Sequence, residues 1–283
     1  MDKSSKEIQI EQLGHTNLLK WIFWLFWDWS LIIMAIVAID KIHNWFVWVL
    51  AMILIGSRQH AIAILGHDGT HLLAAQNRRI NDFLTNLFCF LPFGVTLNSY
   101  RVVHLQHHNY LGTDKDPELD FKKAMGSCWD LPTTKRAIVL RFFKDLAALG
   151  WSDSIEVMKS LPIKRSRDYA YLFIFWLFAI MALFMIGKLW IIPVWFIAIF
   201  LPNWAVFRLR IWSEHVGTMD THRLKASWWQ RWLFLPHNTW YHYEHHKWPW
   251  VPFYNLSKAR EHITDPSPAS FSNLMSFFSN VRS

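Results

Sequence analysis

Long apolar runs alternate with polar, basic stretches along this chain. Four of the runs approach 20 residues, the length that an α-helix needs to cross the hydrocarbon core of a bilayer. They cover residues 21–39, 45–65, 169–186 and 189–207. Buried helices of soluble proteins rarely run so long without charge. The pattern therefore predicts an all-α integral membrane protein with four transmembrane helices.

Short polar links join these helices in two pairs. Residues 40–44 separate the first two runs, and Gly187 and Lys188 separate the last two. Links of this length allow only a tight turn, so each pair is predicted to form a hairpin. Two hairpins return the chain to the same side of the bilayer, which places both termini and the lobes 66–168 and 208–283 together.

The distribution of positive charge predicts which side this is. The chain holds 29 Lys and Arg residues and has a net charge of +8. Only Lys41 and Lys188 lie in the short links and only Arg58 lies within a span, so the others all fall on the side of the lobes. Because loops rich in Lys and Arg stay in the cytosol, the lobes are predicted to form a cytosolic helical cap on one domain, residues 1–283. The charge then reflects orientation and contact with anionic headgroups rather than nucleic-acid binding.

A fifth apolar run, residues 83–97, is too short for a confident span. It contains Pro92 and Gly94, and we interpret it as an interfacial or re-entrant segment. The tryptophans of the first span are interpreted as an interfacial aromatic belt. These are Trp21, Trp24, Trp27 and Trp29.

Two further features of the sequence argue against other classes of protein. Cys89 and Cys128 are the only cysteines and do not form a C-x-x-C pair, which argues against a disulfide framework or a thiolate zinc site. The first 20 residues lack the charged, apolar and cleavage regions of a signal peptide.

Histidine is concentrated in three short boxes, one H-x-x-x-H and two H-x-x-H-H. They hold eight of the fifteen histidines, namely His67, His71, His104, His107, His108, His242, His245 and His246. Residues at i, i+3 and i+4 share one face of a helix, so the imidazoles of each box point the same way. Neutral imidazole binds Fe, Zn, Cu and Ni. Eight imidazoles exceed the four ligands of tetrahedral zinc and fit two metal ions with positions left for a small ligand.

Polar side chains beside the boxes are natural hydrogen-bond partners for the second ring nitrogen of each ligand. We predict this role for Asp68, Glu214, His237, Asn238 and Glu244. Asp114 and Asp116 fit that role and that of a solvated loop acid equally well. His237 is also a rival metal ligand, although contact with a ligand or with substrate fits its position better. No catalytic residue beyond the metal ligands is predicted.

The first box by itself leaves another class open. His67 and His71 have the i, i+4 spacing of zinc proteases, but Asp68 stands where those enzymes have the Glu that acts as base. Metal carriers tend to hold their ligands near the bilayer midplane, whereas the boxes lie outside the spans. A zinc membrane protease or a metal carrier is therefore a remote alternative.

Three stretches carry a likeness to a known family. The first is residues 66–71, with the sequence GHDGTH. The second is residues 100–118, with YR before the second box and GT and DPE after it. The third is residues 237–256, with HN, YHYEHH and then the prolines and YNL. In this order, the boxes resemble those of the membrane fatty acid desaturase superfamily, which includes lipid hydroxylases and carotenoid ketolases and hydroxylases. The third stretch is most similar to bacterial members. The likeness covers roughly residues 20 to 260 and is specific for the superfamily rather than for one reaction.

The resemblance implies a centre of two irons, cycling between Fe²⁺ and Fe³⁺, with O₂ as cosubstrate. The family usually adds a ninth imidazole from the end of the fourth span, and His215 in Ser213-Glu214-His215 matches that place. Two electrons must come from a separate donor of the ferredoxin, rubredoxin or cytochrome type, because no carrier module is visible in the chain. Such donors tend to be acidic and would dock on the basic cytosolic face.

The implied reaction is the O₂-dependent removal of hydrogen from an unactivated C–H bond. We expect desaturation of a long-chain fatty acyl lipid in the bilayer. A hydroxylase or ketolase acting on a carotenoid or another apolar lipid is the alternative, because both reactions share the first hydrogen removal. The likeness to bacterial members implies an inner-membrane protein with termini and active site in the cytosol.

Overall fold

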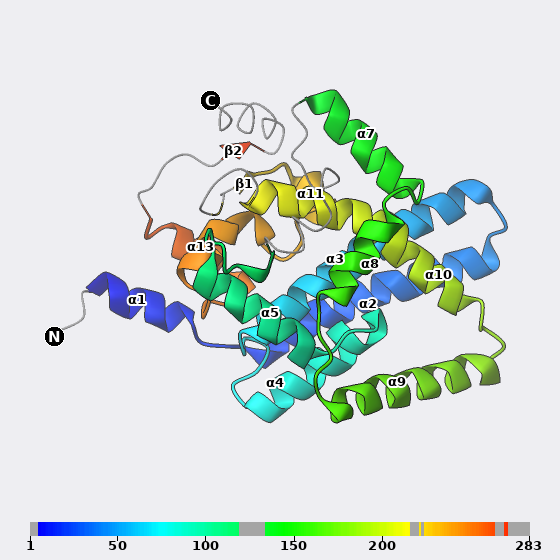
Figure 1. The fold of residues 1–283 in the computed structure, drawn as a ribbon, viewed down its shortest axis with the longest axis horizontal. Coiled ribbons are helices and arrows are strands. Elements are labelled where there is room, and N and C mark those ends of the chain that lie inside the picture. The colour runs from blue at the N-terminus through cyan, green and yellow to red at the C-terminus, as the bar shows by residue number, and fades with distance from the viewer. Residues whose placement is uncertain (1–4, 119–133, 216–220, 222–223, 264–268, 271–283) are drawn as a thin grey trace.

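The computed structural model describes residues 5–118, 134–215, 221, 224–263 and 269–270, and most of them are helical (Figure 1). The α-helices are α1 (Ser5–Leu13), α2 (Leu18–Lys41), α3 (Trp45–Thr70), α4 (Arg78–Thr85), α5 (Leu97–Tyr110), α7 (Lys135–Leu146), α8 (Trp151–Lys159), α9 (Ser166–Met185), α10 (Ile191–Ala198), α11 (Trp204–His215), α12 (Trp228–Leu233), α13 (His242–Lys247) and α14 (Leu256–Arg260). Short 3₁₀ or π turns are η1 (Asn86–Phe90), η2 (Leu91–Phe93), η4 (Ile199–Asn203), η5 (Thr239–Tyr241) and η6 (Phe253–Asn255). Two short strands, β1 (Leu224–Lys225) and β2 (Ala269–Ser270), pair in parallel.

Four helical stretches are long and apolar enough to cross a membrane. They are α2, α3, α9 and the run Ile191–Glu214, which comprises α10, η4 and most of α11. This confirms the four long apolar helices expected from the sequence, with ends that differ by a few residues. The second and fourth stretches continue past the predicted spans, to Thr70 and Glu214. Both helices therefore extend from their apolar parts directly to the neighbourhood of a histidine box.

The two short links lie next to each other at one end of the molecule. The Lys188 ammonium, between α9 and α10, is 2.6 Å from the Asp40 carboxylate at the end of α2. Figure 1 shows α1, α13 and α14 at the opposite end of the α2–α3 pair. The second and third histidine boxes, on α5 and α13, thus lie away from the links, near the far end of α3.

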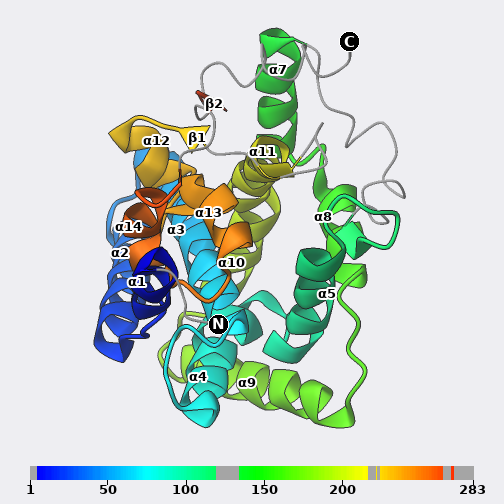
Figure 2. The ribbon, with the colours of Figure 1, turned by 90° about the vertical axis from the view of Figure 1, so that its left-hand side faces the viewer.

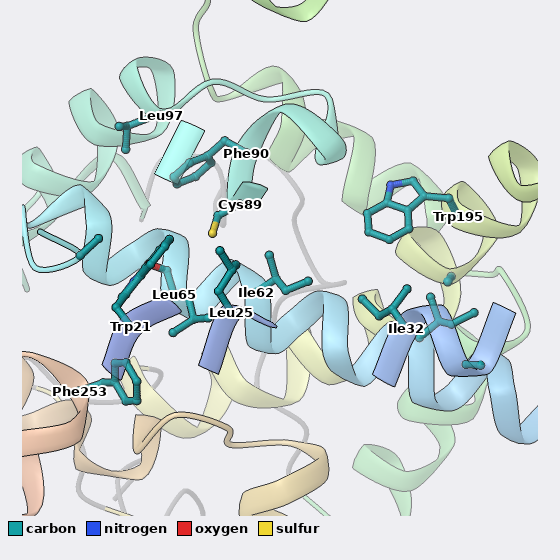
Figure 3. Close-up of a cluster of buried hydrophobic side chains, with 14 of the residues drawn as sticks. Trp21, Leu25, Ile32, Ile62, Leu65, Cys89, Phe90, Leu97, Trp195 and Phe253 are labelled. Atoms are coloured by element: carbon teal, nitrogen blue, oxygen red, sulfur yellow. The ribbon is translucent and has the colours of Figure 1, made fainter. Parts of the chain in front are cut away.

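The core is built on the contact between α2 and α3 and extends to the turn η1 (Figure 3). Trp21 is fully buried and its indole N–H donates to the Leu65 carbonyl. Trp29 stacks on Trp195 of α10 with ring centroids 5.5 Å apart. Trp24 and Trp27 are more than a third exposed. Two of the four tryptophans predicted to form an interfacial belt therefore pack inside the helical bundle instead.

The segment from α4 to α5 folds back on itself. The two helical parts meet at an angle of 96°, with Gly94 in the left-handed conformation (φ 73°) at the corner. A bend of this size fits the re-entrant segment expected around Pro92, and it fits a broken membrane span as well. Arg101 of α5 fixes the second part: its guanidinium donates to the backbone carbonyls of Gly69 and Thr70 and to Asp82.

Buried ion pairs attach the remaining segments to the long helices. Arg208 of α11 lies 2.7 Å from Asp145 of α7 and 2.6 Å from Asp153 of α8. In α3, Arg58 pairs with Asp28 of α2 at 3.1 Å and donates to the Trp232 carbonyl. Because an unpaired buried charge is costly, each pair fixes the position of the chain segment that brings its partner.

Candidate metal centre

The three histidine boxes lie on helical segments that meet at one end of the molecule. His67 lies in the last turn of α3 and His71 follows directly as the residue that ends it. The second box occupies the C-terminal half of α5, and the third forms most of α13. Each box is helical, so its i, i+3 and i+4 residues share a face, as their spacing requires.

Five of the eight box histidines converge on a single point. Their ligand nitrogens all lie within 4.8 Å of one another, and the five are His67, His71, His104, His108 and His245. The Nε2 atoms of His71 and His104 are 2.8 Å apart, and those of His108 and His245 are 3.1 Å apart. Two nitrogens that each lie about 2.1 Å from one metal at roughly 90° are themselves about 3 Å apart. The spacing is therefore that of neighbouring ligands around a metal ion.

The other three box histidines form an adjoining group. The Nε2 atoms of His242 and His246 are 3.1 Å apart, and the rings of His107 and His246 have centroids 5.1 Å apart. His246 also stacks on His108 of the first group, at 4.1 Å between centroids. Two groups of imidazoles thus lie side by side. His215, expected as a ninth ligand, is the last residue of α11, and its side chain lies outside the described part of the chain.

The burial of the box histidines favours a role as metal ligands over a role as charged surface residues. Burial lowers the pKa of His71 to about 3 and holds the pKa values of His245 and His246 well below their usual range, and the neighbouring imidazoles lower them further. All three are therefore neutral at pH 7, the form that binds metal. The Nε2 of His67 is buried without a hydrogen-bond partner among the described residues. A buried polar atom of this kind is unfavourable unless an ion is its partner, so this donor set fits a metal ion.

Asp116 is the carboxylate that orients a box histidine most directly. Both of its oxygens lie 3.0 Å from the Nδ1 of His107. A carboxylate at Nδ1 holds the proton there and leaves Nε2 available as a ligand. The sequence left Asp116, the first residue of the D-P-E stretch eight to ten residues after the second box, equally open to a role in solvent.

The five polar residues predicted beside the boxes are placed in different ways. Glu214 accepts from Arg210 at 2.7 Å and lies 3.7 Å from the Nε2 of His242. Glu244 is fully buried within the third box, 3.5 Å from Arg260. Asp68, also buried, accepts from the backbone N–H of Phe253 at 3.0 Å. It therefore ties the first box to the segment that follows the third.

His237 and Asn238 form the corner that leads into the third box. Both have left-handed backbone conformations, with φ of 52° and 61°, which cost roughly 1–3 kcal/mol each for residues other than glycine. Specific bonds hold the corner: His237 lies 2.6 Å from Asp28, and the Asn238 amide donates to the Phe253 carbonyl at 2.8 Å. The structure thus places His237 against Asp28 of α2, with its ring beside Phe253.

A cavity of about 160 Å³ adjoins the histidines. Most of its exposed wall area is apolar and comes from residues such as Tyr100, Val103, Phe207 and Ile211, while Glu118, Arg210 and Glu214 also line it. Tyr100 also stacks on the ring of His104 at 5.3 Å. An apolar group in this cavity would lie next to the imidazoles, and the sequence carries no signal for the cavity.

Comparison with known proteins identifies the class. The fatty acid desaturase family model matches residues 43–275. Because this match covers most of the sequence, the protein belongs to the fatty acid desaturase family. The membership confirms the resemblance drawn from the boxes. It also makes the protein a desaturase-family oxidoreductase, in place of the zinc protease or metal carrier considered above.

Two relatives are similar to this chain over most of its length. The dihydrorhizobitoxine desaturase of Bradyrhizobium elkanii is 28% identical over 252 residues, which is 80% of this chain and 70% of that protein. The zeaxanthin 4-ketolase of Chlamydomonas reinhardtii is 25% identical over 212 residues, which is 70% of this chain and 40% of that protein. One relative is thus a desaturase and the other a ketolase, so the family membership leaves open which reaction this protein catalyses.

Proposed function

We propose that the protein is an O₂-dependent di-iron oxidoreductase of the membrane that introduces a double bond into a long-chain fatty acyl lipid. The observation that carries this proposal is the convergence of five imidazoles from three separate boxes, with ligand atoms within 4.8 Å of one another. Family membership supports the oxidoreductase class, and the similarity to a desaturase supports the choice of reaction.

The proposal divides the histidines between two irons. The first is held by His67, His71, His104, His108 and His245, and the second by His107, His242, His246 and His215. Short Nε2 contacts within each group support this division. When bound, the irons supply the activation of dioxygen that removal of hydrogen from an unactivated C–H bond requires.

The protein's own residues orient the ligands and hold the substrate. Asp116 fixes the proton of His107 on Nδ1, and the Glu214 carboxylate, held by Arg210, faces His242. The apolar cavity beside the site holds a hydrocarbon segment and excludes water. Overall, two hydrogens leave adjacent carbons while O₂, two electrons and two protons are consumed, and two water molecules are released.

We further propose that the whole chain forms one domain, with two membrane hairpins that place the site and both termini in the cytosol, at a bacterial inner membrane. Contact between the two links, through Lys188 and Asp40, supports a common side for both hairpin turns. A separate ferredoxin-, rubredoxin- or cytochrome-type protein donates the electrons. Its acidic surface would meet the basic cytosolic face.

One specific observation favours a second reaction. The ketolase relative acts, by its name, on zeaxanthin, so insertion of oxygen into a carotenoid or another apolar lipid is the alternative for the same site. Hydroxylation would consume the same O₂, electrons and protons but release one water and leave one oxygen atom on the product. The two reactions therefore differ in product mass.

Product analysis tests the proposal. Cells that express the protein with a compatible electron donor are compared with cells that express the His245→Ala variant, by mass spectrometry of total lipids. New acyl double bonds that depend on His245 are expected. A gain of one oxygen atom in an apolar lipid would favour the alternative, and an unchanged lipid profile with every donor class would contradict both.

Metal content tests the site independently of the reaction. The as-isolated protein is expected to hold about two irons per chain, and the His245→Ala variant less. Stoichiometric zinc in protein isolated at its natural expression level, with iron absent, would contradict the di-iron assignment.

A further inference from the structure

A second and larger cavity, of about 1240 Å³, lies between α9 and the α4–α5 segment. Figures 1 and 2 both show α9 lying beside α4, apart from the α2–α3 pair. Helix α5 lies between this groove and the cavity beside the box histidines, and its residues line both. Tyr100 and His104 face the cavity beside the box histidines, whereas Asn98 and Arg101 line the groove.

One end of the groove is cationic. Its arginines come from three elements and are Arg78, Arg79, Arg101, Arg165 and Arg167. Two hydrogen bonds hold these elements together at that end. Asn98 of α5 donates to Asp168 of α9 at 3.0 Å, and Arg101 of α5 donates to Asp82 of α4 at 2.6 Å. Five guanidinium groups therefore face two carboxylates, Asp82 and Asp168.

Three of these arginines have no acidic partner among the described residues. Arg101 is occupied, because it bonds Asp82 and the carbonyls at the end of α3. Arg79, Arg165 and Arg167 are exposed and lie in the first turn of α4 or at the start of α9. They leave positive charge uncompensated at the mouth of an otherwise apolar groove.

The rest of the groove is lined mainly by apolar side chains, with Asn86 and Tyr171 as the polar exceptions. Phe83 and Leu87 line one wall, and Ile174, Phe175 and Phe178 line the other. From Arg165 to Phe178, α9 rises by about 20 Å at 1.5 Å per residue, somewhat more than half of a bilayer core of about 30 Å. The groove thus has a cationic end and an apolar length that match the headgroup and acyl region of one leaflet.

We propose that this groove binds one anionic phospholipid of the surrounding leaflet. Arg79, Arg165 and Arg167 hold its phosphate, and its acyl chains lie against Phe175 and Phe178. Guanidinium forms bidentate bonds with phosphate. A zwitterionic lipid also carries a phosphate, but its ammonium group opposes the three arginines, whereas an anionic lipid compensates their charge. The inference shares the membrane location with the proposed function but is independent of the reaction.

The test measures lipid retention by the delipidated full-length protein in detergent, using native mass spectrometry. Phosphatidylglycerol and phosphatidylcholine are added separately at equal concentration. One phosphatidylglycerol is expected to bind, and Arg165→Gln with Arg167→Gln should weaken its binding at least about tenfold, because each basic residue at an anionic surface strengthens binding severalfold. The matched control, Arg136→Gln with Lys258→Gln, removes two exposed charges outside the groove and should leave binding within about twofold.

Three outcomes would overturn the proposal. The first is equal retention of the two lipids, and the second is phosphatidylglycerol binding that the Arg165 and Arg167 substitutions leave unchanged. The third is displacement of the lipid by millimolar inorganic phosphate, which would indicate a site for the headgroup alone. The readout needs neither iron nor turnover, so its failure would leave the proposed enzymatic function intact.

Discussion

Helices α3 and α9 are both apolar enough to cross a membrane, yet their surroundings are opposite. In the most apolar window of α3, 67% of the residues are buried inside the protein, against 6% in α9. The mean hydropathy of α9 is the higher of the two, 1.9 against 1.6. Hydropathy therefore identifies both helices as candidate spans but does not indicate which one builds the site.

Small and polar residues within the apolar run make the difference. A side chain at Gly56 of α3 would come within 2.6 Å of Pro202, so glycine there lets η4 approach closely. Gln59 of α3 donates to the Trp195 carbonyl, and Arg58 pairs with Asp28. Polar groups at membrane depth must find partners within the protein, so they force neighbouring segments onto α3. Within its predicted span, α9 presents mainly aromatic and aliphatic side chains to its surroundings.

The largest effect is expected from removing single ligands at the α3 end. His107→Ala and His245→Ala should each lower turnover by at least about a hundredfold, because losing a ligand costs more than losing its hydrogen-bond partner. Turnover per folded chain, measured in isolated membranes, checks this. His43→Ala in the α2–α3 link is the control and should be active. Near-normal activity of either ligand variant would show that the site is misassigned.

A smaller loss is expected from Asp116→Asn, which keeps the shape of the side chain but removes the charge that orients His107. Substituting a residue that hydrogen-bonds a metal ligand typically lowers metal affinity or activity 10- to 100-fold. Iron retained after dialysis against a chelator gives the measurement. Asp114→Asn, two residues away and exposed, is the matched control. Equal iron retention by both variants would argue against an orienting role for Asp116.

The packing contrast between the two helices can be tested with small-to-large substitutions. At Gly69, within the first box, a Cβ would lie 2.1 Å from the Thr85 hydroxyl of α4. Gly69→Ala should therefore destabilise the protein by about 1–3 kcal/mol, as overpacking does, and Thr85→Ala should partly restore it. Thermal unfolding in detergent measures this. Ala170→Leu on the exposed face of α9 should be nearly neutral, and a larger loss there than at Gly69 would reverse the comparison.

The smallest effect concerns pH. The pKa of His71 is lowered to about 3 and those of His245 and His246 lie well below 6.5 in the folded protein. The unfolded chain therefore takes up protons at about pH 6.5 and below that the folded protein does not, so stability falls as the pH falls. The melting temperature of the metal-free protein should drop by a few degrees between pH 7.5 and pH 6.5. A rise over that range would contradict the burial of neutral imidazoles.

Much of this architecture was predictable because its signals are local. A run of about 20 apolar residues and an i, i+3, i+4 histidine box each depend on neighbours along one helix, so the four long helices and the helical boxes follow from sequence. The continuation of α3 to Thr70 also fits, because only Gly66 separates the span from His67 and no proline interrupts the helix.

What could not be predicted are pairings between distant segments. His237 meets Asp28 across 209 residues, and Trp21 meets Leu65 across 44. The sequence around a tryptophan near a span end does not show whether its side chain faces lipid headgroups or the protein interior. Likewise, nothing in the sequence distinguishes Asp116, which reaches His107, from the exposed Asp114.

The spread of the histidines along the chain has a consequence for biosynthesis. His71 bonds a residue 33 positions away, and His245 contacts one 137 positions away. Chains emerge from the ribosome at about 5–20 residues per second, so the second box precedes the third by roughly 7 to 27 seconds. The complete set of candidate ligands therefore exists only once nearly the whole polypeptide has been synthesised.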